Sequence, residues 1–200
     1  MTRPRRALLL FAHPCDDSYC RSVADVAERA LVDGGSHVDR IDLYSVGFRA
    51  AMSADEWVAY ESEDPILDEQ VRDHAELLLR ADTLVFVYPT WWGGLPAILK
   101  GWLERVMVPG VGFEFDARTG KVRPGLRHVR RIVGISTYGS PWWTVKLLND
   151  NGRRTLTRAL RLSCGWQVRA GWLGLYGMDS TTGEERSAFL ARVERKLRDL

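Results

Sequence analysis

Short apolar runs alternate with longer amphipathic stretches from one end of the chain to the other. Runs rich in aliphatic and aromatic residues predict buried or half-buried β-strands at residues 7–12, 37–43, 83–88, 131–137 and 167–173. Between these runs, apolar residues recur at helical spacing and predict helices at 23–31, 53–60, 66–80, 96–106, 142–162 and 184–197. Because parallel neighbours need a crossover connection, the alternation predicts an α/β fold whose parallel sheet is covered by helices on both faces.

The 200 residues are enough for one sizeable hydrophobic core. Period-2 patterning and turn residues in the stretch GFEFDARTGKVRPGL (112–126) indicate a surface hairpin or excursion from that core. No linker, repeat or low-complexity tract divides the sequence. A single domain over residues 1–200 is therefore expected.

Charge and cysteine content narrow the class of protein. The formal net charge is +2, and arginine-rich segments at 3–6, 127–131 and 153–161 alternate with acidic ones. Solvated faces are the simpler interpretation of these segments, and a phosphate-contacting strip is the alternative. The sequence contains no nucleic-acid module and no apolar run of membrane-spanning length, so neither kind of partner is expected. The three cysteines lack paired metal spacing, which predicts a cytoplasmic protein with reduced thiols and no metal site.

In parallel α/β sheets, ligands bind beyond the carboxyl ends of the strands, which here selects loops 12–19, 89–95 and 136–143. The first loop leads into a helix whose cap is Asp16, Asp17 or Ser18, and such a helix start suits a phosphate. The glycines of a dinucleotide fingerprint and of a P-loop are missing. Phosphate binding would therefore depend on His13, Ser18 and backbone amides, with an ordinary capped helix as the alternative.

Paired tryptophans occupy the other two loops, at 91–92 and 142–143. Indole rings beside glycines, whose backbone can approach a ligand closely, suit a planar, hydrogen-bonding heterocycle, whereas burial in the core is the alternative. The stretch GISTY is not a nucleophile elbow, because Tyr138 stands where the second glycine is required. Taken together, the three loops predict a phosphate-bearing flat cofactor and disfavour a hydrolase.

Four motifs between residue 7 and about residue 140 are similar to those of a known family: AHP followed by Ser18 and Tyr19, YPTWWGGLPAILKGWLERV, PGVGFEF with Gly125 and Leu126, and STYG. The chain resembles flavodoxin-like NAD(P)H:quinone oxidoreductases, including bacterial modulators of drug activity and ancillary subunits of potassium-efflux systems. The resemblance implies a doubly wound five-stranded sheet of order 2-1-3-4-5. It also implies a homodimer with the active site at the subunit interface.

The resemblance further implies a bound flavin, NAD(P)H as co-substrate and a quinone or similar flat aromatic acceptor. FAD is expected, because Glu104 stands where FAD-binding relatives have an acidic residue near the adenosine, and FMN is the alternative. Hydride transfer through flavin N5 needs no catalytic side chain, only orientation and charge control.

By position, the resemblance also assigns residues to the cofactor. The residues expected along the phosphates are His13, Asp17, Ser18, Tyr19 and Cys20. Those expected around the isoalloxazine are Pro89, Thr90, Trp91, Trp92, Gly93, Ser136, Thr137, Tyr138 and Gly139. Trp92 is expected to pack its indole on the ring and Trp91 to contribute mainly its backbone amide. Trp142 and Trp143 are expected to wall the acceptor.

The sequence departs from the family pattern at Cys20, commonly an asparagine, at Gly93, commonly a second aromatic residue, and at Tyr138, commonly a glycine. The tyrosine and histidine that mammalian members place beyond the third loop have no counterparts, since Thr144 and Asp150 occupy those positions. Tyr138 either replaces their assistance or crowds the flavin. Two alternative functions follow: a flavin-bound regulatory subunit whose partner contacts 112–126, and a biosynthetic enzyme that has lost flavin.

Overall fold

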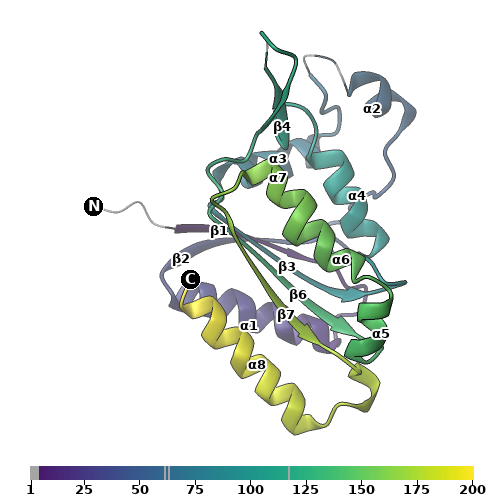
Figure 1. The fold of residues 1–200 in the computed structure, drawn as a ribbon, viewed down its shortest axis with the longest axis vertical. Helices are drawn as coiled ribbons and strands as arrows, with labels where there is room; N and C mark the ends of the chain where they lie inside the picture. Colours follow the sequence, from purple (N-terminus) through teal and green to yellow (C-terminus); the bar gives the residue numbers. More distant parts are fainter. Residues whose placement is uncertain (1–4, 61, 63, 117) are drawn as a thin grey trace.

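Five parallel strands form one sheet in the computed structural model, which describes residues 5–60, 62, 64–116 and 118–200. They are β1 (Arg5–Phe11), β2 (Ser36–Asp42), β3 (Thr83–Thr90), β6 (Arg131–Tyr138) and β7 (Arg169–Leu175). Their spatial order, β2-β1-β3-β6-β7, confirms the predicted doubly wound topology. The expected excursion is a hairpin of β4 (Phe113–Phe115) and β5 (Val122–Pro124), which projects from one end of the molecule (Figure 1). Arg3 of the first arginine-rich segment lies outside the described residues.

Helices cover both faces of the sheet (Figure 1). One face packs against α1 (Tyr19–Asp33) and α8 (Gly183–Arg198). The other packs against α3 (Glu69–Arg80), α4 (Ala97–Val106), α6 (Asn151–Arg154) and α7 (Leu160–Cys164). Two short helices, α2 (Ala54–Ala59) and α5 (Trp142–Leu147), lie at the periphery, and a 3-10 turn spans Met178–Ser180. The central strand β3 is buried on both faces, which explains its apolar sequence between Thr83 and Thr90.

The single long helix predicted at 142–162 is wrong. The chain breaks after α5, where Asn149 and Asp150 have positive φ angles of 70° and 45°, and it resumes in α6. A π-helical turn, Thr155–Ala159, then joins α6 to α7. Asn and Asp tolerate the left-handed region better than other non-glycine residues, so the stretch Asn149-Asp150-Asn151-Gly152 favours a turn over a continuous helix.

Most element boundaries differ by a few residues from the pattern-based expectation, including the starts of α3 and of the last strand. The helix predicted to start at Ile66 begins at Glu69, because the Asp68 carboxylate caps it by accepting a hydrogen bond from the Gln70 amide. The last strand begins at Arg169, two residues later than predicted. Neither shift moves a predicted strand out of the sheet.

A buried ion network connects α4 to Arg49, Glu56 and Asp68, which come before β3 in the chain. Arg105 is 2% exposed, and its guanidinium donates hydrogen bonds to Glu56 Oε1 and, at 2.8 Å, to Asp68 Oδ2. It also donates to the Arg49 carbonyl at 2.6 Å. One arginine thereby ties α4 to α2, to the cap of α3 and to the loop before α2. Since α4 directly follows the tryptophan loop at 89–95, this network holds one end of that loop.

Candidate active site

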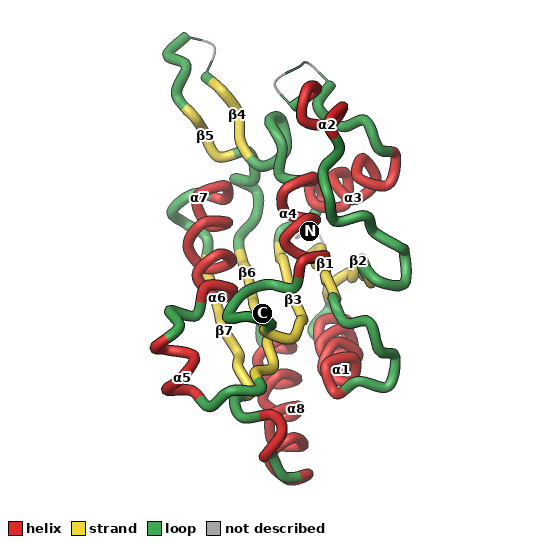
Figure 2. The backbone as a smooth tube through the Cα atoms, turned by 90° about the vertical axis from the view of Figure 1, so that its right-hand side faces the viewer, coloured by secondary structure: helices red, strands yellow, loops and turns green. Residues whose placement is uncertain are grey.

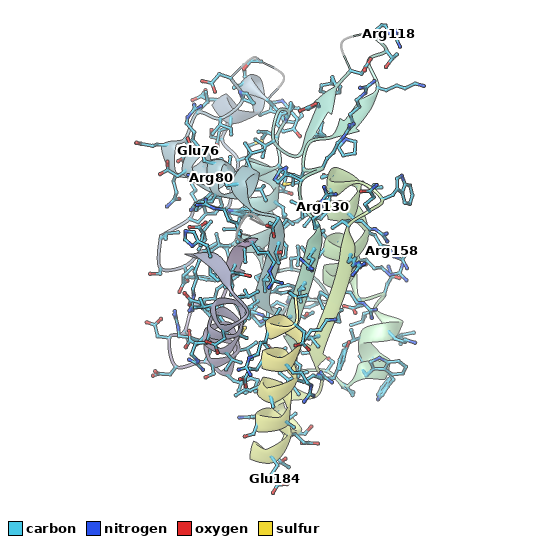
Figure 3. All side chains as sticks on the ribbon, turned by 90° about the vertical axis from the view of Figure 1, so that its left-hand side faces the viewer. Glu76, Arg80, Arg118, Arg130, Arg158 and Glu184 are labelled. Carbon is cyan, nitrogen blue, oxygen red and sulfur yellow. The ribbon has the colours of Figure 1, made fainter. Side chains whose placement is uncertain are left out.

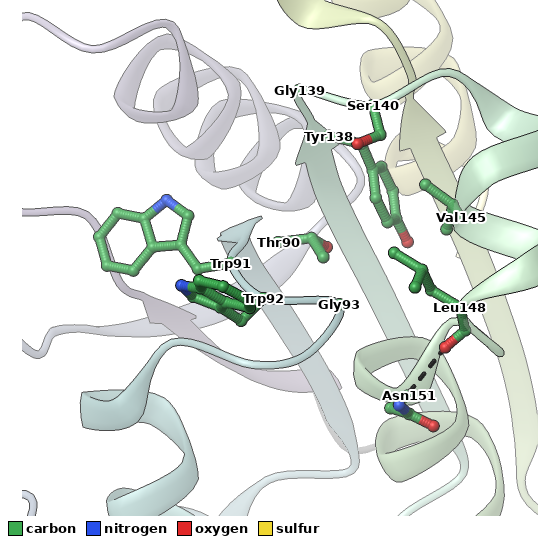
Figure 4. Close-up of a pocket in the computed structure, with 10 residues that line it drawn as sticks. All are labelled: Thr90, Trp91, Trp92, Gly93, Tyr138, Gly139, Ser140, Val145, Leu148 and Asn151. Carbon is green, nitrogen blue, oxygen red and sulfur yellow. Dashed lines mark hydrogen bonds between the residues drawn. The ribbon is translucent and has the colours of Figure 1, made fainter.

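A cleft of 750 Å³ opens at the carboxyl edge of the sheet, the edge that faces the viewer in Figure 2. It lies between the ends of β3 and β6, and α5 closes its far side (Figure 4). The residues that line it are Thr90, Trp91, Trp92, Gly93, Tyr138, Gly139, Ser140, Val145, Leu148 and Asn151. This volume is typical of a site for a small organic ligand, and the lining is mainly apolar and aromatic.

The second loop is a tight turn that presents Trp92 to solvent. The Trp91 and Gly94 backbones exchange two hydrogen bonds, of 3.3 and 3.0 Å, so the Trp91 amide expected to face a flavin is already engaged. The amides of Trp92 and Gly93 donate to no other described residue and are the available donors of this loop. Trp92 has a φ of 49° and is fully exposed. A tryptophan held in the left-handed region costs about 1 kcal/mol or more, and such strain concentrates at functional sites.

The third segment contributes less exposed surface than the sequence suggested. Ser136 and Thr137 are buried within β6, and the Ser136 hydroxyl lies 2.7 Å from the Thr90 hydroxyl. Neither lines the cleft, whereas Gly139 and the unpredicted Ser140 do. Pro89 is likewise buried inside β3. These residues lie near the ends of β3 and β6, where they position the second and third loops.

Tyr138 forms part of the cleft wall while its own side chain is buried. Its ring stacks on Tyr176 with centroids 4.5 Å apart, and its hydroxyl donates a 3.0 Å hydrogen bond to Asp150 Oδ1. Burial, and next the charge of Asp150, raise the pKa of the Tyr138 phenol well above its ordinary value, so the hydroxyl stays protonated. In Figure 4 the ring lies beside Val145 and Leu148, on the side of the cleft across from Trp91 and Trp92.

Replacing Tyr138 with phenylalanine should lower the free energy of unfolding by about 1.5 kcal/mol. The half-buried Asp150 carboxylate would lose its hydroxyl donor, and hydrogen bonds to charged groups contribute about that much. Urea denaturation measures the change. Tyr44→Phe is the matched control, because the Tyr44 hydroxyl makes no hydrogen bond among the described side chains; an equal loss in both variants would contradict the role of Asp150.

The first loop places a helix start near the second loop, as predicted. Ser18 is the cap of α1, and its hydroxyl accepts a 3.2 Å hydrogen bond from the Arg21 amide. The His13 ring lies 6.3 Å from the Trp91 ring, centroid to centroid, and accepts from the Cys15 amide at 3.0 Å. Asp17 is exposed in the same loop. A phosphate at this position would meet Ser18, His13 and the unengaged first amides of α1.

Two side chains assigned to the phosphates point elsewhere. The Tyr19 hydroxyl donates a 2.7 Å hydrogen bond to the Arg186 carbonyl of α8. The Cys20 thiol is buried in the core between α1 and the sheet, and burial raises its pKa to about 12. Only the backbone amides of these two residues remain available to an anion.

The tryptophans of α5 lie beside the cleft rather than in it. Trp142 and Trp143 are exposed, and the Lys146 ammonium lies 4.2 Å from the Trp142 ring centroid. The cleft is instead lined by Val145 and Leu148, on the same turn of chain, and by Asn151. Sequence reasoning missed these three residues, although the polar turn at 149–152 was a readable signal for a break there.

The sheet order and a cleft at the carboxyl edge, with a capped helix start after the first strand, define a flavodoxin-like α/β protein. The model of a family described as having a flavodoxin-like fold matches residues 5–199, so the chain belongs to this family.

Several proteins that are similar to this chain have names that agree with the resemblance of the motifs. The chain is 35% identical over 134 residues to an uncharacterized NAD(P)H oxidoreductase of Haemophilus influenzae, an alignment that covers 66% of this chain and 64% of that relative. It is 28% identical to NAD(P)H dehydrogenase [quinone] 1 of Cavia porcellus, over 100% of this chain and 78% of that protein. The solved NAD(P)H:quinone oxidoreductase from Methanothermobacter marburgensis superposes with a TM-score of 0.79 at 26% identity, covering 98% of this chain and 97% of that one.

Two features are absent from the part of the chain that the structure describes. No helix there is long and apolar enough to cross a membrane. Within the same residues, no three His, Cys, Asp or Glu side chains come together as a metal ion would require.

Proposed function

We propose that the chain is a flavin-dependent NAD(P)H oxidoreductase that reduces a quinone or a similar flat aromatic acceptor. The observation that carries this proposal is the fully exposed Trp92, held in a strained left-handed conformation at the mouth of a 750 Å³ cleft. Because the Trp92 indole is exposed, it does not stabilise the core and is available to a ligand. The names of the relatives favour the same activity.

The residues of the cleft suit a flavin. The Trp92 indole offers an apolar platform for the ring system, and the amides of Trp92 and Gly93 are free to bind its polar edge. Ser18, His13 and the start of α1 suit the phosphate. A bound flavin would supply the hydride-transfer chemistry, and this chain would bind the ring, orient it and exclude water.

The test uses purified protein loaded with FMN or, separately, FAD, and mixed with NADH or NADPH and menadione. We expect nicotinamide oxidation well above the rate with free flavin. A protein that stays colourless and binds neither flavin would overturn the proposal and favour the flavin-free alternative. The choice of FAD stays a prediction. The Glu104 side chain, on which that choice depends, pairs with Lys100 on the surface. Chromatography of the compound released by heat identifies the flavin.

Replacing Trp92 with glycine should change flavin affinity and stability in opposite directions. Loss of the stacked indole should weaken flavin binding roughly tenfold, while release of the left-handed strain should raise the free energy of unfolding by about 1 kcal/mol. Flavin titration and urea denaturation measure the two effects. Trp166→Ala removes another exposed indole, distant in sequence, and should leave flavin affinity unchanged; equal weakening in both variants would contradict the assignment of Trp92.

We also propose that a second copy of the chain completes the site. Trp142, Trp143 and Leu147 are exposed on α5 beside the cleft, and Leu147 is 81% exposed. Apolar side chains gathered in this way favour an interface. Light scattering should give twice the chain mass, and Trp143→Asp should shift it toward the monomer.

A partner-dependent regulatory role remains the second candidate. The projecting β4–β5 hairpin exposes Phe115 and Val122, and apolar residues on an isolated hairpin favour a protein contact. A hairpin variant with both residues replaced by serine should retain menadione reduction if the hairpin serves only a partner.

A further inference from the structure

The amino edge of the sheet, opposite the candidate active site, carries a concentration of arginines. A hollow of 580 Å³ is lined by Arg5, Arg6, Leu79, Arg80, Asp82, His128, Arg130 and Arg131. A second hollow of 330 Å³ shares Arg130 and Arg131 and adds Gln167 and Arg169. The two hollows share these two arginines in their walls, and we call them together the arginine cleft. Six arginines and one carboxylate line it, although the formal net charge of the whole chain is only +2.

Of these six arginines, Arg80 lies 3.9 Å from Glu76, whereas the other five form no ion pair with the residues that the structure describes. Arg131 and Arg169 begin neighbouring strands and lie directly opposite each other in the sheet. Like charges in that relation destabilise a sheet. Among the described residues, neither forms an ion pair, and nor do Arg6 and Arg130. By contrast, Arg21, Arg40 and Arg105 each contact two carboxylates.

The one carboxylate of the cleft does not neutralise it. Asp82 accepts hydrogen bonds from the Arg6 amide at 3.1 Å and from the Thr83 hydroxyl at 2.8 Å, so both oxygens serve the backbone and a neighbouring hydroxyl. Arg80 lies in the last turn of α3, where a cation stabilises the helix end. The arginines that begin β6 and β7 have no such helix to stabilise.

We propose that the arginine cleft binds a short oligophosphate anion, such as the triphosphate of a nucleotide or inorganic tripolyphosphate. A guanidinium group matches a phosphate with two parallel hydrogen bonds, and several adjacent guanidinium groups call for several linked phosphates. The concave shape favours a small ligand over an extended nucleic acid. A long polyanion would also meet Glu76, which lies beside Arg80 on this edge of the molecule (Figure 3).

Isothermal titration calorimetry with inorganic tripolyphosphate and, separately, with ATP tests the proposal at about 0.15 M salt, where weak surface attraction is screened. We expect saturable one-to-one binding of tripolyphosphate. Equal affinity for ATP would mean that only the phosphates are recognised, and tighter binding of ATP would mean that the nucleoside also makes contact; both support the proposal. The flavin content of the protein should not affect this binding.

The variant pair Arg130→Gln/Arg169→Gln should weaken tripolyphosphate binding about 100-fold, since each charged contact contributes roughly tenfold. Both side chains are exposed, so the variant should fold. The control pair, Arg118→Gln/Arg195→Gln, removes the same charge from exposed positions; Arg118 lies far away at the hairpin tip (Figure 3). Absence of saturable binding, an equal loss in the control pair, or duplex DNA that binds without competition from tripolyphosphate would each overturn the proposal.

Discussion

Replacing Arg105 with alanine should lower the free energy of unfolding by about 3 kcal/mol and the melting temperature by roughly 10 °C. The guanidinium is 2% exposed and forms hydrogen bonds to Glu56, Asp68 and the Arg49 carbonyl. Its removal leaves Glu56, which is 7% exposed, without its main partner. An unpaired buried charge costs several kcal/mol. Arg49 lies 3.7 Å from Glu56 and can compensate partly, which keeps the expected loss near 3 kcal/mol.

The pH dependence of this loss distinguishes a charge effect from simple loss of packing. Burial alone would raise the pKa of Glu56, but hydrogen bonds from Arg105 and Ser53 lower it overall; a hydrogen bond from Arg105 is the main cause of the lowered pKa of Asp68. Groups with a lowered folded pKa stabilise the protein fully above their unfolded pKa values, here 4.5 and 3.8. That stabilisation is lost as the pH falls through the folded pKa values.

Urea denaturation of both proteins between pH 3 and pH 7 measures the difference, which should be largest at neutral pH and shrink below about pH 4.5. Arg105→Lys is the control that keeps the charge. It should recover only part of the stability, because a single nitrogen does not span the separated acceptors that Arg105 reaches with Nε, Nη1 and Nη2. A difference that is constant with pH would show that packing alone is lost.

The fold was predictable because burial along each strand is visible in the sequence. The run from Thr83 to Tyr88 is apolar at every position after the first, as a strand covered on both faces must be. The break at Asn149 and Asp150 was missed because apolar residues keep a helical spacing on both sides of it, although the polar stretch 149–152 favours a turn and long-range contacts stabilise it. Asp150 accepts the Tyr138 hydroxyl, and the Asn151 amide donates to the Gly93 carbonyl at 3.2 Å. Local periodicity continues through such a position, so a pattern of helical spacing does not reveal it.

The candidate site was predictable in its loops but not in the directions of its side chains. The expected residues Trp91, Trp92 and Gly93 line the cleft, because the loop that follows a parallel strand lies at the carboxyl edge, where such clefts form. Cys20 was assigned to the phosphates, yet it precedes Val23 and Ala24 on the buried stripe of α1. Extending the helical pattern back by one turn would have placed its thiol in the core. Arg105 was missed because a charged residue interrupts the apolar pattern that identifies a buried face.

Replacing Gly101 with alanine should lower the free energy of unfolding by about 2 kcal/mol, although alanine is intrinsically the better helix former. Gly101 lies inside α4, and a Cβ there would stand 2.2 Å from the Ala50 carbonyl oxygen and 2.6 Å from the Ala50 Cα. Both neighbours are backbone atoms, so no side-chain rotation relieves the overlap. Moving α4 away costs up to about 3 kcal/mol, of which the higher helix propensity of alanine offsets about 1 kcal/mol.

The same displacement should also weaken flavin binding. It moves α4 away from the loop before α2, to which Arg105 binds through the Arg49 carbonyl, and α4 follows directly after the Trp91–Gly94 turn that lines the cleft. Urea denaturation and flavin titration measure the two effects on one sample. Gly183→Ala is the matched control, since Gly183 is also helical but a Cβ there meets nothing within 4 Å. The control should be as stable as the parent protein or slightly more so. If Gly101→Ala matched the control in both measurements, the loop before α2 would move aside at no cost in stability. The close approach of α4 to Ala50 would then not position the cleft.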